Sequence, residues 1–317
     1  MPGDLEVWLD IASGDDADFV ARAFRLLVRR PPEPEAVAEY VRLFESGDLS
    51  RAGLLQKLAA TEEFAEVALL DDAVARALRL RGRPRELTAP AWSGERAIEI
   101  PWCLARHDGE RRVLYVGYAF AEPAWVAGVL ALGAEVTGVD LAERDVPGMR
   151  RAVGDVRKLP FGDGSFDLAY CVSTLEHVGH ANDRYGVESE RDEEGDAAAL
   201  RELQRVLDGE GRLLVSVPTG VADDQGWQVQ RSPEDWVARF EEAGFVVFED
   251  ELYVRAPEGW RSATLAEARD ARYGEGPGPG AGAILLAELR SKSFGERLRL
   301  AVRDARHRDQ PRRSTLD

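Results

Sequence analysis

The sequence predicts an α/β protein, in which a doubly wound and mostly parallel sheet follows an all-α module. Up to about residue 85, apolar residues recur at helical spacing. From about residue 95, short β-rich runs alternate with helical segments, a pattern typical of parallel strands joined by crossover helices. With 44% hydrophobic residues among 317, the chain can bury a substantial core in one or two domains.

The first 85 residues read as a helical module. Two amphipathic segments, separated by Pro31-Pro32, contain Phe19, Ala23, Leu26, Leu27 and then Val37, Tyr40, Val41, Phe44. Ser50 is suited to cap a third helix, and Thr61-Glu-Glu-Phe64 begins a further turn or helix. A change in composition near Arg81 predicts a linker over residues 86–94, so the helical module is expected over residues 1–85.

Residues 95–290 are expected to form the sheet domain. We predict strands at residues 112–116, 135–139, 151–153, 166–172, 212–217, 245–254 and 283–289, and helices near residues 123–132, 196–207 and 233–243. Only a short crossover fits between residues 140 and 151. Residues 291–317 form an arginine-rich tail, expected to be a helix with a frayed end.

Charge and composition narrow the classes of partner. A net charge of −17 argues against a broad surface for nucleic acid or anionic membranes, because phosphate binding needs clustered Lys and Arg. Cys103 and Cys171 are too few for a disulfide framework and are expected to be reduced packing residues. The N-terminus lacks a basic region followed by an apolar run, and no apolar stretch approaches the ~20 residues of a membrane span. We therefore expect a cytoplasmic protein with no membrane span.

Polar and small residues follow four of the predicted strands, at the edge where doubly wound sheets bind ligands. The turn Gly117–Glu122 precedes Pro123, which suits a first helical position, and its backbone N–H groups would favour a carboxylate. Asp140 ends the next strand and can accept both hydroxyls of a ribose. Residues 154–156 could read an adenine edge through Asp155 and the backbone. The fourth strand end carries residues 174–179, which include the candidate catalytic residue His177.

The turn after the first strand bears on the kind of ligand. A dinucleotide fold would need G-x-G-x-x-G to admit a bulky pyrophosphate, and Gly117-Tyr-Ala-Phe-Ala-Glu does not supply it. A ligand with adenosine but no phosphates fits better, which disfavours a nicotinamide-dependent oxidoreductase.

Four motifs carry a family resemblance. They are Gly154-Asp-Val-Arg-Lys-Leu-Pro-Phe-Gly-Asp-Gly-Ser-Phe-Asp167, Ser173-Thr-Leu-Glu-His177, Leu203-Gln-Arg-Val-Leu207 and Gly211-Arg-Leu-Leu-Val-Ser-Val-Pro218. With them, residues 95–290 resemble a class I S-adenosylmethionine-dependent methyltransferase with a seven-stranded, Rossmann-like sheet. Residues 95–102, the Gly117 turn and residues 184–186 are similar to an uncharacterised bacterial branch often linked to surface-polysaccharide genes.

The N-terminal module carries a separate resemblance. Residues 16–70, from Asp18-Phe-Val-Ala-Arg-Ala-Phe to Thr61-Glu-Glu-Phe64, resemble a small helical module of unknown function whose pattern is related to phycobilisome linkers. Such modules are often attached to enzymes of cell-surface glycan assembly. The resemblance implies an adaptor that binds a protein partner, with no catalytic role.

The methyltransferase resemblance implies S-adenosylmethionine as cofactor and a set of residues that bind it. That set is Gly117, Tyr118, Ala119, Glu122, Asp140, Leu141, Asp155, Val156 and Ser173. The chain departs from the family pattern at Tyr115, where an acid is usual, and at Ala119 and Ala121, where glycines are usual. We hypothesise that Glu122 replaces the missing acid and pairs with the cofactor's ammonium group. Alternatively, Glu122 only stabilises a helix N-terminus.

Three residues are candidates for catalysis or acceptor binding. His177 and His180 follow the fourth strand, where either could act as a base, although His177 could instead pack at a helix start and His180 could lie in a solvated loop. Tyr185 could line an acceptor pocket. The resulting prediction is O-methylation of a sugar, a cell-surface glycan precursor or another small polar acceptor. The alternative, prompted by Tyr115 and the missing glycines, is a non-catalytic scaffold in a glycan-assembly complex.

The acidic run over residues 188–196 has two interpretations. Its oxygen ligands would suit Mg²⁺ or Ca²⁺, but their spacing is not ordered. We expect no metal, and instead a solvated loop whose last acid, Asp196, caps the following helix. Asp223-Asp224 and Trp227 could approach an acceptor or lie in a surface loop.

Overall fold

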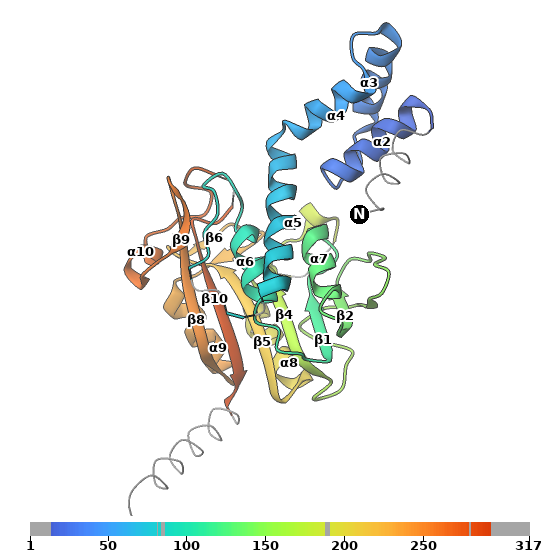
Figure 1. Ribbon diagram of the computed structural model, residues 1–317. Coiled ribbons are helices and arrows are strands. Elements are labelled where there is room, and N and C mark those ends of the chain that lie inside the picture. The colour runs from blue at the N-terminus through green and yellow to red at the C-terminus, as the bar shows by residue number, and fades with distance from the viewer. Residues whose placement is uncertain (1–13, 81, 84–85, 188–190, 279, 293–317) are drawn as a thin grey trace, which may run out of the picture. The chain divides into compact units, whose positions relative to one another are not determined.

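A computed structural model describes residues 14–80, 82–83, 86–187, 191–278 and 280–292 (Figure 1). The chain divides into two compact units, Met1–Ala75 and Arg76–Asp317. The boundary lies inside one long helix, earlier than the predicted end of the helical module at residue 85. Residues 188–190 of the acidic run and residues 293–317 of the tail lie outside the described residues.

The first unit is helical, as predicted, with helices α2 (Asp16–Leu27), α3 (Pro34–Ser46), α4 (Arg51–Ala59) and the start of α5 (Glu62–Leu80). Its core is formed by Phe19, Val20, Ala23, Phe24, Leu54 and Leu58. Ser50 caps α4 as predicted, since its side chain accepts from the N–H of Gly53 at 3.0 Å. Gly47 ends α3 in the left-handed conformation, with φ of 77°.

The second unit contains a doubly wound, mostly parallel sheet, which confirms the predicted fold class. Its eight strands are β1 (Arg112–Val116), β2 (Glu135–Asp140), β3 (Arg150–Val153), β4 (Phe166–Val172), β5 (Leu207–Pro218), β8 (Phe245–Ala256), β9 (Gly259–Ser262) and β10 (Ala283–Ser291). They lie in the order β3-β2-β1-β4-β5-β10-β8-β9, with β3, β2, β1, β4 and β5 parallel and β10 antiparallel to both of its neighbours. All seven predicted strands are present, and β9 adds an antiparallel edge strand that the sequence analysis missed.

Alternate residues of the central strands face two different helical layers. Leu114 and Ala169 belong to a core shared with helices α8 (Gly195–Val206) and α9 (Pro233–Glu242). Their neighbours Tyr115 and Tyr170 pack on Trp125 of α7 (Pro123–Leu130), with ring centroids 5.4 and 5.1 Å apart. Burial on both faces explains why these strands read as continuous apolar runs.

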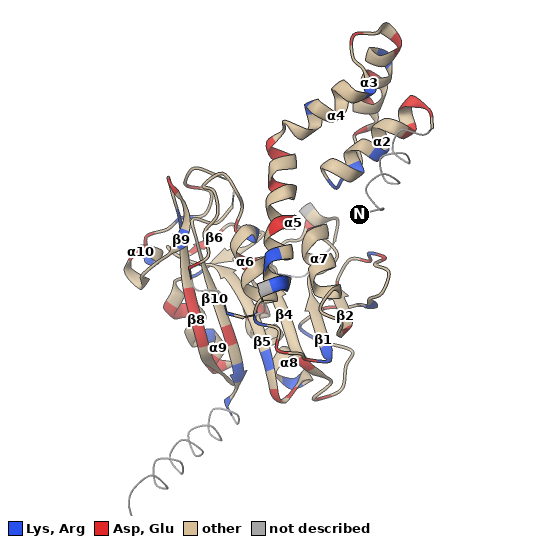
Figure 2. Cartoon of the chain, in the orientation of Figure 1, with Lys and Arg blue, Asp and Glu red and all other residues tan. Residues whose placement is uncertain are grey.

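Helix α6 (Arg96–Leu104) was not predicted, and it is anchored on the acidic stretch of β8 (Figure 2). Trp102 donates its indole N–H to Glu251 at 3.0 Å, and Arg106, which follows the helix, forms an ion pair with the same carboxylate. Arg106 also lies over the Trp102 ring, 3.8 Å from its centroid. These contacts hold α6 in place, and α6 in turn positions Arg96 and Glu99 at the ligand-binding edge.

The predicted linker packs against the sheet edge. Ala89 forms a bridge with Trp260 of β9, whose backbone N–H donates to Ala89 at 2.8 Å and whose indole N–H donates to Ser93 at 3.0 Å. The short segment over residues 86–94 gives no periodic signal for this pairing, because the partner lies far away in the chain. Helix α10 (Leu265–Arg269) and the hairpin β6 (Asp223–Asp224) with β7 (Val229–Gln230) were also missed.

Several local expectations have clear outcomes. Cys103 and Cys171 are buried and not disulfide-bonded. Asp196 does not cap α8, which begins at Gly195; it is 2% exposed and pairs with Arg231 at 2.8 Å. The acid is buried because α9 and the preceding segment supply cations that sequence spacing does not reveal. Within the described ranges, no helix is both long and apolar enough to cross a membrane.

Candidate functional site

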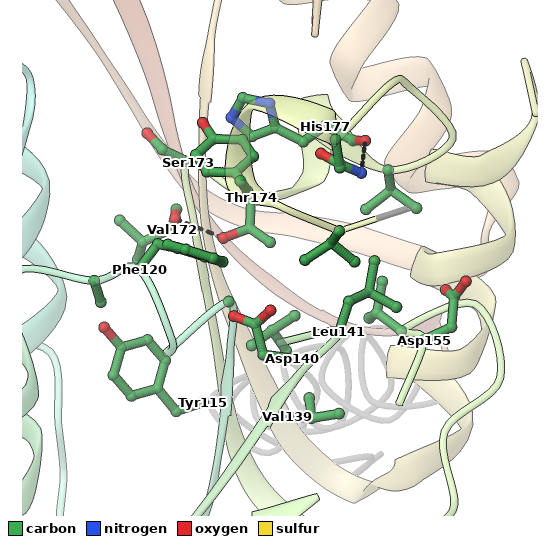
Figure 3. A pocket seen from close by; sticks show the side chains of 18 of the residues that line it. Tyr115, Phe120, Val139, Asp140, Leu141, Asp155, Val172, Ser173, Thr174 and His177 are labelled. Atoms are coloured by element: carbon green, nitrogen blue, oxygen red, sulfur yellow. Dashed lines mark hydrogen bonds between the residues drawn. The ribbon is translucent and has the colours of Figure 1, made fainter. Parts of the chain in front are cut away.

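The ends of β1, β2 and β4 enclose a cavity of about 190 Å³, here called the front cavity (Figure 3). Seven of the nine predicted cofactor-binding residues line it, namely Gly117, Glu122, Asp140, Leu141, Asp155, Val156 and Ser173. The candidates His177 and Tyr185 line it too. The structure therefore brings most of the predicted site together at the edge where it was expected.

Gly117 makes the tight turn after β1. Its φ is +76°, a conformation that residues with a side chain adopt only under strain. A Cβ at this position would also lie 2.8 Å from Cγ2 of Thr174, well inside normal contact distance. The chain then reaches Pro123 at the first position of α7, as predicted. Glycine is thus required at one position of the turn, and Ala119 and Ala121 suffice at the others.

Asp140 ends β2 with its carboxylate directed into the front cavity (Figure 3). Its two oxygens accept from the backbone N–H groups of Ala119 at 2.9 Å and Ala142 at 3.1 Å. Burial raises the pKa of Asp140, although these N–H groups act in the opposite direction. Each oxygen keeps a lone pair, so the carboxylate can still accept from two hydroxyls of a ligand.

Asp155 is held by a cation on its own turn. Arg157 donates to both carboxylate oxygens, the shorter bond measuring 2.6 Å. Burial acts to raise the pKa of Asp155, but the hydrogen bonds and charge of Arg157 outweigh it, and the pKa is lowered. Part of the hydrogen-bonding capacity of Asp155, which was predicted to bind an adenine edge, is therefore used within the protein. Val156, which also lines the cavity, supplies an apolar surface.

Glu122 belongs to a chain of ionic contacts that begins on α6. Arg96 donates to Glu122 Oε1 at 3.1 Å and pairs with the buried Glu99. Glu99 in turn accepts from the hydroxyl of Ser173 at 2.7 Å. Glu122 Oε2 is buried and has no hydrogen-bond partner within the described part of the chain. Glu122 occupies the N-cap position of α7 without a side-chain capping bond, so capping does not account for it.

A second cavity of about 180 Å³, here called the rear cavity, shares part of its lining with the front cavity. It is lined by Glu95, Arg96, Ser173, Glu176, His177, Tyr185, Pro218, Trp227, Gln228, Tyr273, Ala281 and Ile284. Four of these, Arg96, Ser173, His177 and Tyr185, line both cavities. The two cavities therefore adjoin.

His177 and Tyr185 stand at the junction. His177 Nδ1 lies 3.0 Å from the carbonyl oxygen of Trp227, which can only accept, so Nδ1 carries a hydrogen and neutral His177 presents Nε2 as an acceptor. Its ring stacks on Trp227, with centroids 5.3 Å apart, and meets Tyr185 edge-on at 5.6 Å. Trp227 thus lies on the rear cavity, while Asp223 and Asp224 form an exposed hairpin strand.

Three predicted site residues do not line either cavity. Tyr118 is fully buried, lies over Gly138 of β2 and donates its hydroxyl to the carbonyl of Arg144 at 3.2 Å. Ala119 contributes its backbone N–H to Asp140 instead of to the cavity wall. His180 turns towards Asp224, with Nδ1 3.7 Å from the carboxylate, and burial lowers its pKa. In this structure these three placements do not support a direct role in binding or catalysis.

Sequence reasoning missed Arg96, Glu99 and Glu176. Arg96 and Glu99 are spaced three apart within an otherwise apolar run, a signal of functional charge on a buried helix that was available. Glu176 directly precedes His177, and its 2% exposure could not be anticipated from the motif. Among the described residues, no group of three or more His, Cys, Asp or Glu side chains is arranged to hold a metal.

Comparisons with known proteins agree with this geometry. A family model described as a methyltransferase domain matches residues 121–215. An uncharacterized protein of Methanocaldococcus jannaschii is 32% identical over 68 residues, which are 22% of this chain and 23% of that protein. The chain thus spans less than a quarter of the length of this curated relative.

Solved structures include distant likenesses. The 1,6-didemethyltoxoflavin-N1-methyltransferase of Burkholderia thailandensis, crystallised with S-adenosylhomocysteine, has a TM-score of 0.41 and 16% identity, covering 83% of this chain and 92% of that chain. A possible histamine N-methyltransferase of Thermotoga maritima has a TM-score of 0.39 and 16% identity, covering 61% and 88%. Likenesses at this level carry no argument about the substrate.

The residues of the front cavity fit S-adenosylmethionine. A cationic ammonium group needs an anionic partner, and the unpartnered Oε2 of Glu122 is one. The two hydroxyls of a ribose need acceptors, which Asp140 has, and an adenine ring needs apolar walls such as Leu141 and Val156. The fold and this fit are those expected of a methyltransferase that uses S-adenosylmethionine, and the matched methyltransferase domain model covers residues 121–215 of this chain.

Proposed function

We propose that this chain transfers a methyl group from S-adenosylmethionine in the front cavity to a small polar acceptor in the rear cavity. The observation that carries the proposal is that the two cavities adjoin and share Ser173, His177 and Tyr185. A methyl donor and an acceptor held on either side of these residues would be in reach of each other, and such positioning supplies much of the rate of methyl transfer.

The residues have distinct roles in this proposal. Glu122 would hold the ammonium group of the cofactor and Asp140 its ribose, while Asp155 and Val156 would lie against the adenine. When bound, the cofactor would supply an electrophilic methyl group to an acceptor atom that gives up a proton, with S-adenosylhomocysteine as the other product. The Arg96–Glu99–Ser173 contacts position the wall between the cavities.

A calorimetric titration with S-adenosylhomocysteine tests the proposal. We expect one binding site for S-adenosylhomocysteine in the wild type and no measurable binding in Asp140→Ala. In a second experiment, candidate metabolites and glycans are incubated with methyl-labelled cofactor, and we expect the label to appear on the acceptor. A folded protein with no affinity for this compound would contradict the proposal.

The finer expectations from the sequence remain predictions. They are an oxygen acceptor on a sugar or glycan precursor, a protein partner for the helical module, and a cytoplasmic location. The lining of the rear cavity bears on the acceptor and favours an amine over an oxygen acceptor.

A non-catalytic scaffold is the second candidate, and one observation favours it. Tyr115, which replaces the acid usual in the family, lines the front cavity, and no partner for its buried hydroxyl is found among the described residues. If this ring narrows the site, the affinity for cofactor would be lost. The same titration decides between the two, since the scaffold predicts that Tyr115→Glu gains the affinity that the wild type lacks.

A further inference from the structure

The rear cavity has an excess of carboxyl groups. Glu95 and Glu176 line it, whereas Arg96 is the cation among its lining residues. The charge of Arg96 is engaged by Glu99 and Glu122, which lie at its two sides. Arg255 lies near Glu95, but it donates to the carbonyl of Gly280 at 3.3 Å and is not part of the lining. The cavity lining therefore carries more carboxyl groups than cationic side chains.

Glu176 is the sharpest of these observations. It is 2% exposed, and its Oε2 has no hydrogen-bond partner in the part of the chain that the structure describes. Its other oxygen lies 3.9 Å from Nε2 of His177, beyond hydrogen-bond distance. A buried polar atom without a partner is costly, and such atoms in a cavity wall commonly mark where a ligand donates.

Aromatic rings form the other side of the rear cavity. Trp227 meets Tyr273 edge-on, with ring centroids 5.8 Å apart, and stacks on His177, which in turn contacts Tyr185. Aromatic faces attract cations, and aromatic rings combined with carboxylates are a recurrent way of binding ammonium groups. A volume of about 180 Å³ suits a ligand with one ring, given that roughly 150 Å³ accommodates benzene.

We propose that the rear cavity is the acceptor site and that it takes a cationic amine, whose nitrogen lies between Glu176 and the aromatic rings. The inference rests on the proposed function and names its substrate class. An ammonium group must lose one proton to expose a lone pair for methylation. As the ammonium ion binds, the carboxyl group of Glu176 gives its own proton to solvent. The resulting carboxylate then accepts the proton of the ammonium group and becomes neutral again, the form that its buried surroundings favour.

The surroundings of Glu176 support this proton transfer. Burial raises the pKa of Glu176 to about 8. The carboxyl groups of Glu99 and Glu95 act in the same direction, while the backbone N–H of Glu176 itself and the charge of Arg96 oppose them. The side chains of His177, Cys171 and Tyr273 are further titratable groups near Glu176. At pH 7 the empty cavity thus holds a neutral Glu176. Binding of an ammonium ion should then release about one proton to solvent, whichever partner keeps the charge.

The test compares two probes of the same shape, 2-phenylethylamine and 2-phenylethanol, by calorimetry at pH 7 in two buffers of different ionisation enthalpy. We expect the amine to bind about 10- to 100-fold more tightly than the alcohol, with release of about one proton for the amine alone. Glu176→Gln should abolish both the preference and the proton release. Glu194 is an exposed N-cap residue, and Glu194→Gln should change neither the preference for the amine nor the proton release.

Binding of S-adenosylhomocysteine is measured on each variant, so that failure of this inference is distinguished from failure of the proposed function. If Glu176→Gln does not fold, Trp227→Leu is the second variant. We expect it to weaken binding of the amine several-fold and to leave the affinity for the alcohol nearly unchanged. A protein that binds S-adenosylhomocysteine but prefers the alcohol, binds neither probe, or keeps its preference in Glu176→Gln overturns the inference. Preference for the alcohol would point to the oxygen acceptor instead.

Discussion

Replacing Glu122 by Gln should weaken binding of S-adenosylhomocysteine about 10- to 30-fold. Hydrogen bonds to charged groups contribute about 1.5–3 kcal/mol. The lower half of that range applies here, because the Glu122 side chain is 33% exposed and already shares its charge with Arg96. About 1.5–2 kcal/mol corresponds to the stated loss in affinity. Calorimetric titration of both proteins at low salt measures it.

Two controls make the Glu122 prediction specific. 5′-Methylthioadenosine lacks the amino-acid tail, so Glu122→Gln should leave its affinity unchanged. Glu194 occupies the N-cap position of α8 and pairs with Arg239 at 2.6 Å, yet it lies outside both cavities, so Glu194→Gln should leave both affinities unchanged. Equal affinity of wild type and Glu122→Gln for S-adenosylhomocysteine would refute the assignment and leave Glu122 as an acid at a helix N-terminus.

Three further predictions concern Asp140, the first turn and Glu176. Asp140→Asn should weaken the binding of 5′-methylthioadenosine about 10- to 100-fold, because an amide cannot accept hydrogen bonds from both ribose hydroxyls and both backbone N–H groups. An unchanged affinity in calorimetry would place the ribose elsewhere. Gly117→Ala should lower the free energy of unfolding in urea by at least about 1 kcal/mol more than Gly133→Ala does. Both glycines have φ near +76°, but of the two only Gly117 is crowded by a neighbouring side chain. Equal losses would show that Thr174 can move aside without destabilising the fold. Because the pKa of folded Glu176 is raised to about 8, above the unfolded value near 4.5, the folded state binds the extra proton between these pH values, and the free energy of unfolding should fall as pH rises through this window. Glu176→Gln should remove up to about 1.4 kcal/mol per pH unit of that fall, measured by urea denaturation at several pH values, and parallel profiles of the two proteins would contradict a buried, neutral Glu176.

The positions of the strands and of the acids that end them followed from the sequence alone. Val113 to Val116 and Leu168 to Val172 are buried on both faces, so their apolar runs mark them without knowledge of their partners. Asp140 and Gly117 are fixed by the chain geometry at strand ends, which is local. The fold class, and the strand ends at which the front cavity lies, could therefore be predicted.

The tertiary structure alone decided which side chains line the two cavities. Tyr118, next to Gly117, turns into the core because Gly138 on the neighbouring strand leaves room for its ring. Glu176 and His177 are adjacent in sequence, yet only contacts with distant segments bury the carboxyl group and leave its Oε2 without a partner among the described residues. The rear cavity joins residues from 95 to 284, so its charge and its aromatic lining depend on long-range packing that no local pattern records.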